Sequence, residues 1–388
     1  MISLAKNLGA DIATAFVAKD AFDPRARGIK VFELFRETIW TKIPGFRYVQ
    51  VQLAFLLKTG FAKNYDVIIY SGDCLIALVR HLLKHGWPAS RSTAQPFGSV
   101  APAGAAGEMQ KHFADMPTPP RHLYDAYKER LREYVLWKKI IFIPFAAFNR
   151  WRFKFLSKRL DVIVTNSKNT QARIKQCLGL DSVVVYPPCD TLPFRNLLND
   201  DRALGRSHPP TPLEGGFTNG EYFFSWARLY PIKRVDQIVE AFIGMPDKKL
   251  IVASGGPDLE KIKKMAEGHA NITILGWIDD NQLLEYLGKC LATIYIPIRE
   301  DFGMSVVESM QAGKPVIGVA EGGLLEIIEN NKNGILLQPN FTTNDLQVAV
   351  KQMNTEFVQS TEQNCYNTAA KFSEQNFINE FKKAANLL

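Results

Sequence analysis

The second half of the chain alternates short apolar runs with segments whose apolar residues recur at helical spacing. The apolar runs predict buried strands, at residues 222–226, 250–253, 272–275, 292–296, 316–319 and 334–337. The segments between them predict amphipathic helices, at residues 235–242, 259–266, 281–290, 305–312 and 324–329. This alternation is typical of an α/β domain with a parallel sheet covered on both faces. Such sheets bind ligands outside the carboxyl ends of their strands.

The first half of the chain is less regular. Residues 66–70, 161–165 and 183–186 predict buried strands. Residues 87–117 are rich in Ala, Gly, Pro and Ser and contain no apolar run of strand length, so we expect a mobile loop or a poorly ordered insertion there. Residues 186–194 (Tyr-Pro-Pro-Cys-Asp-Thr-Leu-Pro-Phe) predict a stiff connection, which we interpret as the hinge between two domains.

Length and composition agree with two ordinary globular domains. The chain has 388 residues, of which 46% are hydrophobic and 22% charged. It contains no run of about 18 uncharged apolar residues, and its first residues lack the features of a signal peptide. The five cysteines are scattered without metal-ligand spacing. We therefore expect a cytoplasmic protein without a metal site.

The net positive charge of the chain comes from its first half. Residues 1–190 hold 28 Lys and Arg against 15 Asp and Glu, whereas the remaining residues hold 19 against 24. Residues 121–160 alone hold 11 basic and 3 acidic side chains. We expect this half to meet an anionic partner.

Residues 134–155 mix bulky apolar side chains with Lys and Arg. This composition suits a helix lying in the surface of an anionic membrane, and would place the protein at the inner face of a membrane. An amphipathic helix that packs on its own domain with a solvated basic face explains the pattern equally well. Nucleic acid is a poorer partner, because no recognition motif accompanies the charge.

The chemistry of the second half is concentrated after the strand predicted at 292–296. A loop carrying Glu300 and Gly303 leads into a helix that we expect to start at Ser305, with Glu308 in its first turn. A glycine loop at a helix N-terminus can hold a phosphate, and a carboxylate can accept hydrogen bonds from neighbouring sugar hydroxyls. The segment therefore predicts a sugar-nucleotide site. For Glu308 the alternative is a capping box with Ser305, and for Glu300 it is a solvated loop.

Further candidates follow other predicted strands. Arg228 and Lys233 follow the strand at 222–226, where two cations can clamp a diphosphate, although surface cations would give the same pattern. Gly256 and Trp277 follow the next two strands, and Gly322 precedes the helix predicted at 324–329. The glycines allow a close backbone approach to a ligand, but turn formation explains them equally well.

Taken together, these residues resemble glycosyltransferase family 4, the retaining nucleotide-sugar enzymes of the GT-B fold. The resemblance lies in residues 224–234 and 300–317 and covers nearly all of 160–388, while 118–125 and 164–167 are similar to bacterial mannosyltransferase-like enzymes of surface polysaccharide synthesis. The family fold implies two Rossmann-like domains facing each other across a cleft. These would be residues 1–187, on the acceptor side, and 188–372, which bind the donor. A C-terminal helix, 373–388, would pack back on the first.

The resemblance also implies roles for single residues. Arg228 and Lys233 would bind the donor diphosphate and Glu300 the sugar hydroxyls, helped by backbone at Phe302, Gly303 and Met304. Glu308 would bind the ribose. The remaining donor-site candidates are Ser305, Gly256 and Trp277. The family needs no metal and no cofactor besides the nucleoside diphosphate sugar, and its acceptor would be a saccharide or a lipid-linked molecule.

Two features depart from the family pattern. The chain starts at what looks like the helix after the first strand and Gly-Gly loop of the family. Pro117 stands where the family has a His near the reacting sugar, and the strand before it appears replaced by the irregular segment 87–117. The leading hypothesis is a retaining hexosyltransferase. The alternatives are a truncated or non-catalytic nucleotide-sugar-binding homologue and a nucleotide-sugar epimerase of the same fold.

Overall fold

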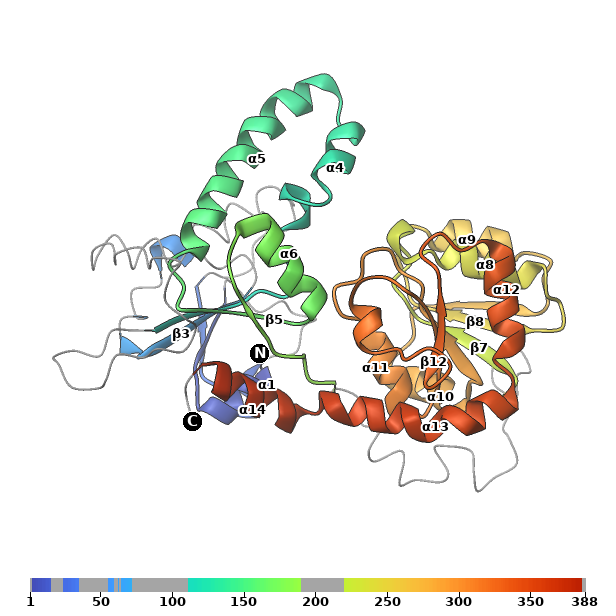
Figure 1. The fold of residues 1–388 in the computed structure, drawn as a ribbon. Coiled ribbons are helices and arrows are strands. Elements are labelled where there is room, and N and C mark those ends of the chain that lie inside the picture. The colour runs from blue at the N-terminus through green and yellow to red at the C-terminus, as the bar shows by residue number, and fades with distance from the viewer. Residues whose placement is uncertain are drawn as a thin grey trace. The chain divides into compact units, whose positions relative to one another are not determined.

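The computed structural model describes residues 2–14, 24–34, 55–58, 62, 64–71, 111–189 and 220–385. The contacts within the chain divide it into two compact units (Figure 1). Unit 1 comprises Met1–Asn166, Thr170–Val185 and Ile378–Leu388, and unit 2 comprises Ser167–Asn169 and Tyr186–Phe377.

Unit 2 is built on a parallel six-stranded sheet in the order β12-β11-β10-β7-β8-β9. Its strands are β7 (Tyr222–Ser225), β8 (Lys249–Ala253), β9 (Ile272–Gly276), β10 (Ala292–Ile294), β11 (Val316–Val319) and β12 (Gly334–Leu337). Its helices are α8 (Val235–Ile243), α9 (Leu259–Ala266), α10 (Asp280–Lys289), α11 (Met304–Gln311), α12 (Thr343–Gln352) and α13 (Thr355–Ala369). Helix α14 (Glu374–Ala384) follows the short 3₁₀ turn η8 (Ala370–Phe372) and continues into unit 1.

Alternate side chains of these strands point to opposite faces of the sheet. Tyr222 and Phe224 of β7 pack in a core beneath α10, whereas Phe223 packs in the larger core formed with α8, α11 and α12. Both faces are covered, and the strand interiors are therefore mainly apolar, with Ser225 and Thr293 as buried polar residues. The six predicted strands and four of the five predicted helices are confirmed within about two residues at their ends.

One prediction in unit 2 is wrong, and the start of α11 differs from its prediction by one residue. Residues 324–329 were expected to form an α-helix, but the segment is the short 3₁₀ helix η7 (Gly322–Glu326). Helix α11 begins at Met304, one residue before the predicted start, because Gly303 adopts the left-handed conformation (φ 108°) that precedes it.

Unit 1 contains a parallel four-stranded sheet in the order β3-β4-β5-β6 and a separate parallel pair, β1 with β2. The strands are β1 (Ile12–Thr14), β2 (Val31–Glu33), β3 (Val67–Ser71), β4 (Lys111–Asp115), β5 (Val162–Thr165) and β6 (Val183–Val184). The helices are α1 (Ile2–Leu8), α4 (Tyr127–Glu133), α5 (Leu136–Ser157) and α6 (Lys168–Leu178), with 3₁₀ turns η1 (Pro24–Arg27) and η5 (Arg121–Leu123). The helix expected at the start of the chain is thus present.

Strand β4 corrects the prediction for residues 87–117. The strand that was expected to be missing before Pro117 lies between β3 and β5. Its sequence, Lys-His-Phe-Ala-Asp, does not show a strand pattern because only Phe113 and Ala114 are apolar. The His112 side chain is nevertheless buried, and its Nδ1 forms a 2.9 Å hydrogen bond with the Tyr70 hydroxyl. Tertiary packing therefore makes the strand. Residues 87–110, and residues 190–194 of the predicted hinge, lie outside the described residues.

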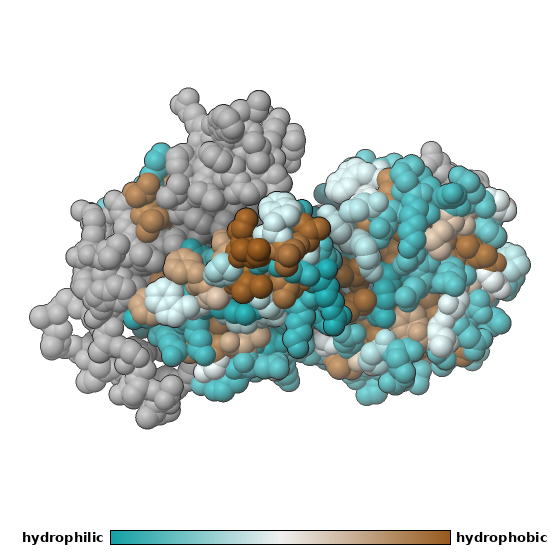
Figure 2. Space-filling model, turned by 90° about the horizontal axis from the view of Figure 1, so that it is seen from above, coloured by the Kyte–Doolittle hydropathy of each residue, from teal (hydrophilic) through white to brown (hydrophobic). Residues whose placement is uncertain are grey.

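Helices α4 and α5 form a hairpin that projects from the sheet of unit 1 (Figure 1). Phe142 of α5 packs on Tyr127 (ring centroids 5.7 Å apart) and on Tyr134 (5.1 Å). Seen from above, hydrophobic residues gather on the surface in this part of unit 1 (Figure 2). Helix α5 therefore packs on its own domain along one side only, and its exposed surface carries large apolar side chains as well as basic ones.

Candidate active site

The site lies at the centre of the unit 2 sheet, where the direction of chain winding reverses. Strands β7 and β10 are neighbours, with Phe223 opposite Ala292 and Phe224 opposite Thr293. From β7 the chain winds outward through β8 to β9, and from β10 it winds the other way through β11 to β12. The loops that leave β7 and β10 lead to helices in opposite directions, and sheets of this kind bind ligands at such a switch point, at the carboxyl ends of the strands. These loops carry Lys233 and Glu300.

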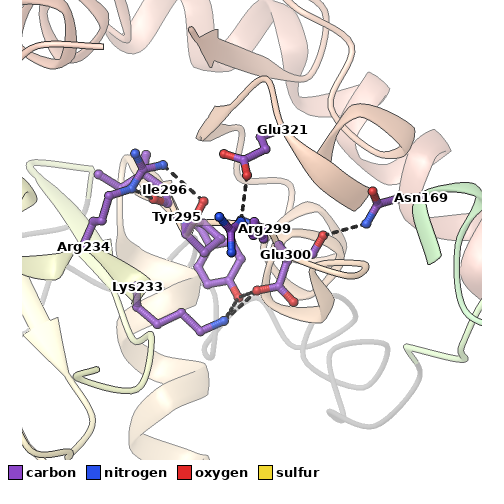
Figure 3. Close-up of polar contacts among 9 residues, drawn as sticks. Asn169, Lys233, Arg234, Tyr295, Ile296, Arg299, Glu300 and Glu321 are labelled. Carbon is purple, nitrogen blue, oxygen red and sulfur yellow. Dashed lines mark hydrogen bonds and ion pairs between the residues drawn. The ribbon is translucent and has the colours of Figure 1, made fainter. Parts of the chain in front are cut away.

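Lys233, Tyr295 and Glu300 form a closed set of contacts across this switch point (Figure 3). The Lys233 Nζ lies 2.6 Å from Glu300 Oε2 and donates to the Tyr295 hydroxyl at 2.7 Å. That hydroxyl in turn donates to Glu300 Oε2 at 2.7 Å. The Lys233 and Glu300 side chains keep 21% and 19% of their surface exposed, so part of the ion pair is accessible to solvent.

The Tyr295 hydroxyl is protonated at neutral pH. Burial, and next the negative charge of Glu300, raise the pKa of Tyr295 well above its ordinary value of 10.0. The neutral phenol therefore remains a hydrogen-bond donor to Glu300. Sequence reasoning missed this residue, because Tyr295 sits inside an apolar run and reads there as a core side chain.

Arg234 fastens the two loops together. Its Nε donates to the Ile296 carbonyl at 2.6 Å and its Nη2 to the Pro297 carbonyl at 3.2 Å (Figure 3). A backbone hydrogen bond from Ile298 to Ile232 (2.8 Å) joins the same loops. Arg234 is buried, with a left-handed backbone (φ 53°), and burial lowers its pKa. This costly conformation persists because the surroundings fix it, and no local sequence pattern predicts it.

Gly322 and Gly323 lie directly against the backbone of the Glu300 loop. A Cβ atom on Gly322 would lie 2.3 Å from the Glu300 carbonyl oxygen, and one on Gly323 would lie 2.4 Å from the Asp301 carbonyl oxygen. The Gly323 N–H donates to the Glu300 carbonyl at 2.9 Å. The Glu321 carboxylate accepts the Arg299 N–H at 3.0 Å. These glycines thus allow a close approach of two loops.

Gly256 likewise allows a close approach of two loops, next to Arg228. A Cβ atom on Gly256 would lie 2.4 Å from the Leu229 carbonyl oxygen, and the Leu229 N–H donates to the Gly255 carbonyl at 3.0 Å. The loop after β8 is therefore pressed against the residue that follows Arg228. Arg228 is exposed and forms no ion pair with any residue that the structure describes. It lies at the same edge of the sheet as Glu300 without contacting it.

The N-terminus of α11 provides the backbone part of the site. Phe302 is buried between Tyr186 (ring centroids 5.8 Å apart) and Phe372 (5.3 Å), so its side chain anchors the loop. Only its backbone is left for a ligand. Gly303 and Met304 follow at the start of the helix, whose first N–H groups have no acceptor within the helix.

Glu308 is not part of a capping box. Ser305 is the second residue of α11, which has Gly303 at its N-cap and no side-chain cap, and Glu308 lies beyond the first turn. The capping alternative and the predicted first-turn position are therefore both wrong. Burial raises the pKa of Glu308, partly countered by a side-chain hydrogen bond with Trp226. A half-buried carboxylate without a capping role remains a candidate for ligand contact.

Trp277 lies away from the ion pair. It follows β9, the edge strand, and 81% of its surface is exposed. Two strand spacings, about 10 Å, separate β9 from β7. The structure thus brings Lys233 and Glu300 together and leaves Trp277 at the outer end of the same sheet edge.

No group of three or more His, Cys, Asp and Glu that could hold a metal ion occurs in the described part of the chain.

Comparison with known proteins agrees with this architecture. Residues 214–372 match the family model of glycosyl transferases group 1. The chain superposes on a sucrose-phosphate synthase from Thermosynechococcus elongatus with a TM-score of 0.70 at 15% identity, covering 99% of this chain and 91% of that one. It superposes on Anabaena Alr3699/HepE, solved in complex with UDP and glucose, with a TM-score of 0.64 at 16% identity, covering 100% and 95%. The chain has the two-domain, Rossmann-like GT-B fold, and its residues 214–372 are similar to group 1 glycosyl transferases.

Curated relatives match this chain only in part. The alpha-1,3/1,6-mannosyltransferase ALG2 of Dictyostelium discoideum is 27% identical over 237 residues, 53% of this chain and 54% of that protein. The N-acetyl-alpha-D-glucosaminyl L-malate synthase of Bacillus anthracis is 27% identical over 178 residues, 45% and 47% of the two chains. The chain thus spans about half the length of these relatives. The matched segment 214–372 contains every site candidate named above, whose individual roles stay predictions.

Proposed function

We propose that the protein transfers a hexose from a nucleoside diphosphate sugar to a hydroxyl of a saccharide or lipid-linked acceptor, with retention of the anomeric configuration. The Lys233–Glu300 pair across the β7–β10 switch point carries the proposal. It places a cation that can bind a diphosphate beside a carboxylate that can bind sugar hydroxyls. The HepE structure in complex with UDP-glucose, a neighbour in fold, supports a donor of this class.

The donor would lie along the carboxyl edge of the sheet. The Lys233 ammonium has three protons, two of which point to Glu300 and Tyr295, and the third can reach a phosphate oxygen. Arg228 would take the other phosphate. Glu300 would accept hydrogen bonds from the sugar hydroxyls, and Glu308 from the ribose. Gly256 and Trp277 lie farther along this edge, where the base would extend.

The two cations would act mainly in the transition state. As the bond from the anomeric carbon to the diphosphate breaks, negative charge grows on the leaving phosphate oxygen. Lys233 and Arg228 stabilise this charge more than that of the bound donor, which lowers the barrier. No metal or further cofactor takes part in this proposal.

Arg228→Ala tests the proposal. We expect a loss of turnover of about 100-fold, the size typical of one electrostatic group, with an unchanged melting temperature because Arg228 is exposed. The assay follows sugar transfer from a panel of nucleoside diphosphate hexoses to saccharide and lipid-linked acceptors. Lys351→Ala, another exposed cation of unit 2, is the matched control.

Other outcomes identify the alternatives. Donor binding without transfer to any acceptor would indicate a non-catalytic binding protein. This alternative is considered because Pro117 stands where the family has a His. A changed sugar nucleotide without acceptor would indicate an epimerase. Wild-type turnover in Arg228→Ala would remove the cationic clamp from the mechanism.

A further inference from the structure

One side of α5 exposes a continuous apolar stripe. The residues recur at intervals of three and four, as one side of a helix requires, and each keeps between 44% and 66% of its surface exposed: Trp137, Ile140, Ile141, Phe145, Phe148 and Trp151. We call these residues the α5 apolar face. A monomeric soluble protein rarely leaves so many large apolar groups together in water.

The opposite side of α5 already has its partners. Ala146, Phe153 and Leu156 are buried, and the last two belong to the core of unit 1. Phe142 packs on α4 through Tyr127 and Tyr134. The α5 apolar face is therefore not needed for the fold of unit 1.

The hairpin is held in place before anything binds. The Arg150 guanidinium lies 3.9 Å from the centre of the Tyr127 ring, and its Nε donates to the Leu123 carbonyl. Trp151 packs on Phe148 within the face (ring centroids 5.9 Å apart) and on Phe155 beside the face (5.3 Å). A preformed surface loses little freedom on docking.

Positive charge borders the face. The Lys138 Nζ lies 5.5 Å from the centre of the Trp137 ring, Lys154 is exposed on the last turn of α5, and Lys158 is exposed directly after it. Lys128 and Arg132 are exposed on α4. Figure 2 shows the hydrophobic surface of this region bordered by hydrophilic side chains. The occupant must therefore be apolar and anionic, and a second copy of this strongly basic region would be repelled.

We propose that the α4–α5 hairpin docks on the surface of an anionic lipid bilayer. The α5 apolar face enters the boundary between headgroups and acyl chains, with its tryptophans at headgroup level, and the lysines bind lipid phosphates. No helix in the described part of the chain is long and apolar enough to cross a membrane. Membrane docking deepens the proposed function, because it would hold a lipid-linked acceptor at the same surface. Only this link to the acceptor rests on the proposed function.

Vesicle flotation of the full chain tests the proposal. We expect the protein to float with vesicles of phosphatidylcholine and phosphatidylglycerol, much less with phosphatidylcholine alone, and less as salt is raised. The double variant Phe148→Ser/Trp151→Ser should bind these vesicles at least about tenfold more weakly, because two large apolar groups no longer leave water. Val348→Ser, an equally exposed apolar residue in unit 2, should bind as wild type does.

Two further readings make the test decisive. The tryptophan emission of the wild type should shift to shorter wavelength when anionic vesicles are added, and the double variant should keep the wild-type melting temperature and donor-induced stabilisation. Wild-type protein that stays unbound with both kinds of vesicle would overturn the proposal. So would a dimer that the double variant dissociates, since a second copy would then cover the face. Flotation without donor binding would instead sink the proposed function alone.

Discussion

Tyr295 acts on the site through its hydroxyl, which touches both charged partners. The Lys233 ammonium and the Glu300 carboxylate each have several rotamers, and the buried phenol fixes one arrangement of the two. Because the phenol is neutral, it adds no charge to the site.

Tyr295→Phe should therefore lower turnover more than it weakens the fold. We expect a loss of about 1 kcal/mol in unfolding free energy, as for one buried hydrogen bond. The value of kcat should fall about tenfold with a smaller change in KM, because the pair would be less precisely placed. Tyr222→Phe is the matched control, since its buried hydroxyl donates to the Tyr286 carbonyl. If both variants lost the same activity, Tyr295 would have only a structural role.

Glu308 should make the stability of the protein depend on pH. Burial raises its pKa above the ordinary value of 4.5, so between that value and its folded pKa the native state binds more protons than the unfolded state. Its contribution to stability is therefore favourable at low pH and falls as the pH rises through this window. Melting temperatures across this range should decline less in Glu308→Gln. Identical pH profiles would show that Glu308 is not buried in this way.

At the scale of elements, glycine contacts determine where the site loops lie. Gly256→Ala should destabilise the protein by about 1–3 kcal/mol, because the new Cβ would overlap the Leu229 carbonyl. The displaced loop should also weaken donor binding through Arg228. Gly255→Ala is the control, since a Cβ there meets nothing within 4 Å. Chemical denaturation of both variants measures the difference, and equal stabilities would contradict the close approach.

The sequence predicted the elements wherever burial is apolar on both faces of a sheet, as in β7 to β12. It failed at β4, where Lys111 and His112 interrupt the pattern and neighbouring strands supply the stability. It also predicted that Lys233 and Glu300 converge, since loops after parallel strands share an edge. It could not predict Tyr295 or Arg234, because their partners lie about 60 residues away in the chain and no local pattern reveals them.

At the scale of the molecule, the two units carry different chemistry. Unit 2 carries the acidic and basic groups of the candidate site, and unit 1 carries the basic hairpin with its exposed apolar face. Each can be impaired without the other, so donor binding and membrane binding should respond to separate substitutions.

Calorimetric titration with a nucleoside diphosphate, and with the same nucleotide carrying a hexose, tests the central claim most directly. Lys233→Met should weaken binding of both ligands, since it removes a phosphate contact. Glu300→Gln should weaken only the sugar nucleotide and leave the nucleoside diphosphate unchanged or tighter, because Lys233 loses its competing partner. Wild-type affinity of both variants for the sugar nucleotide would contradict a donor site at the Lys233–Glu300 pair.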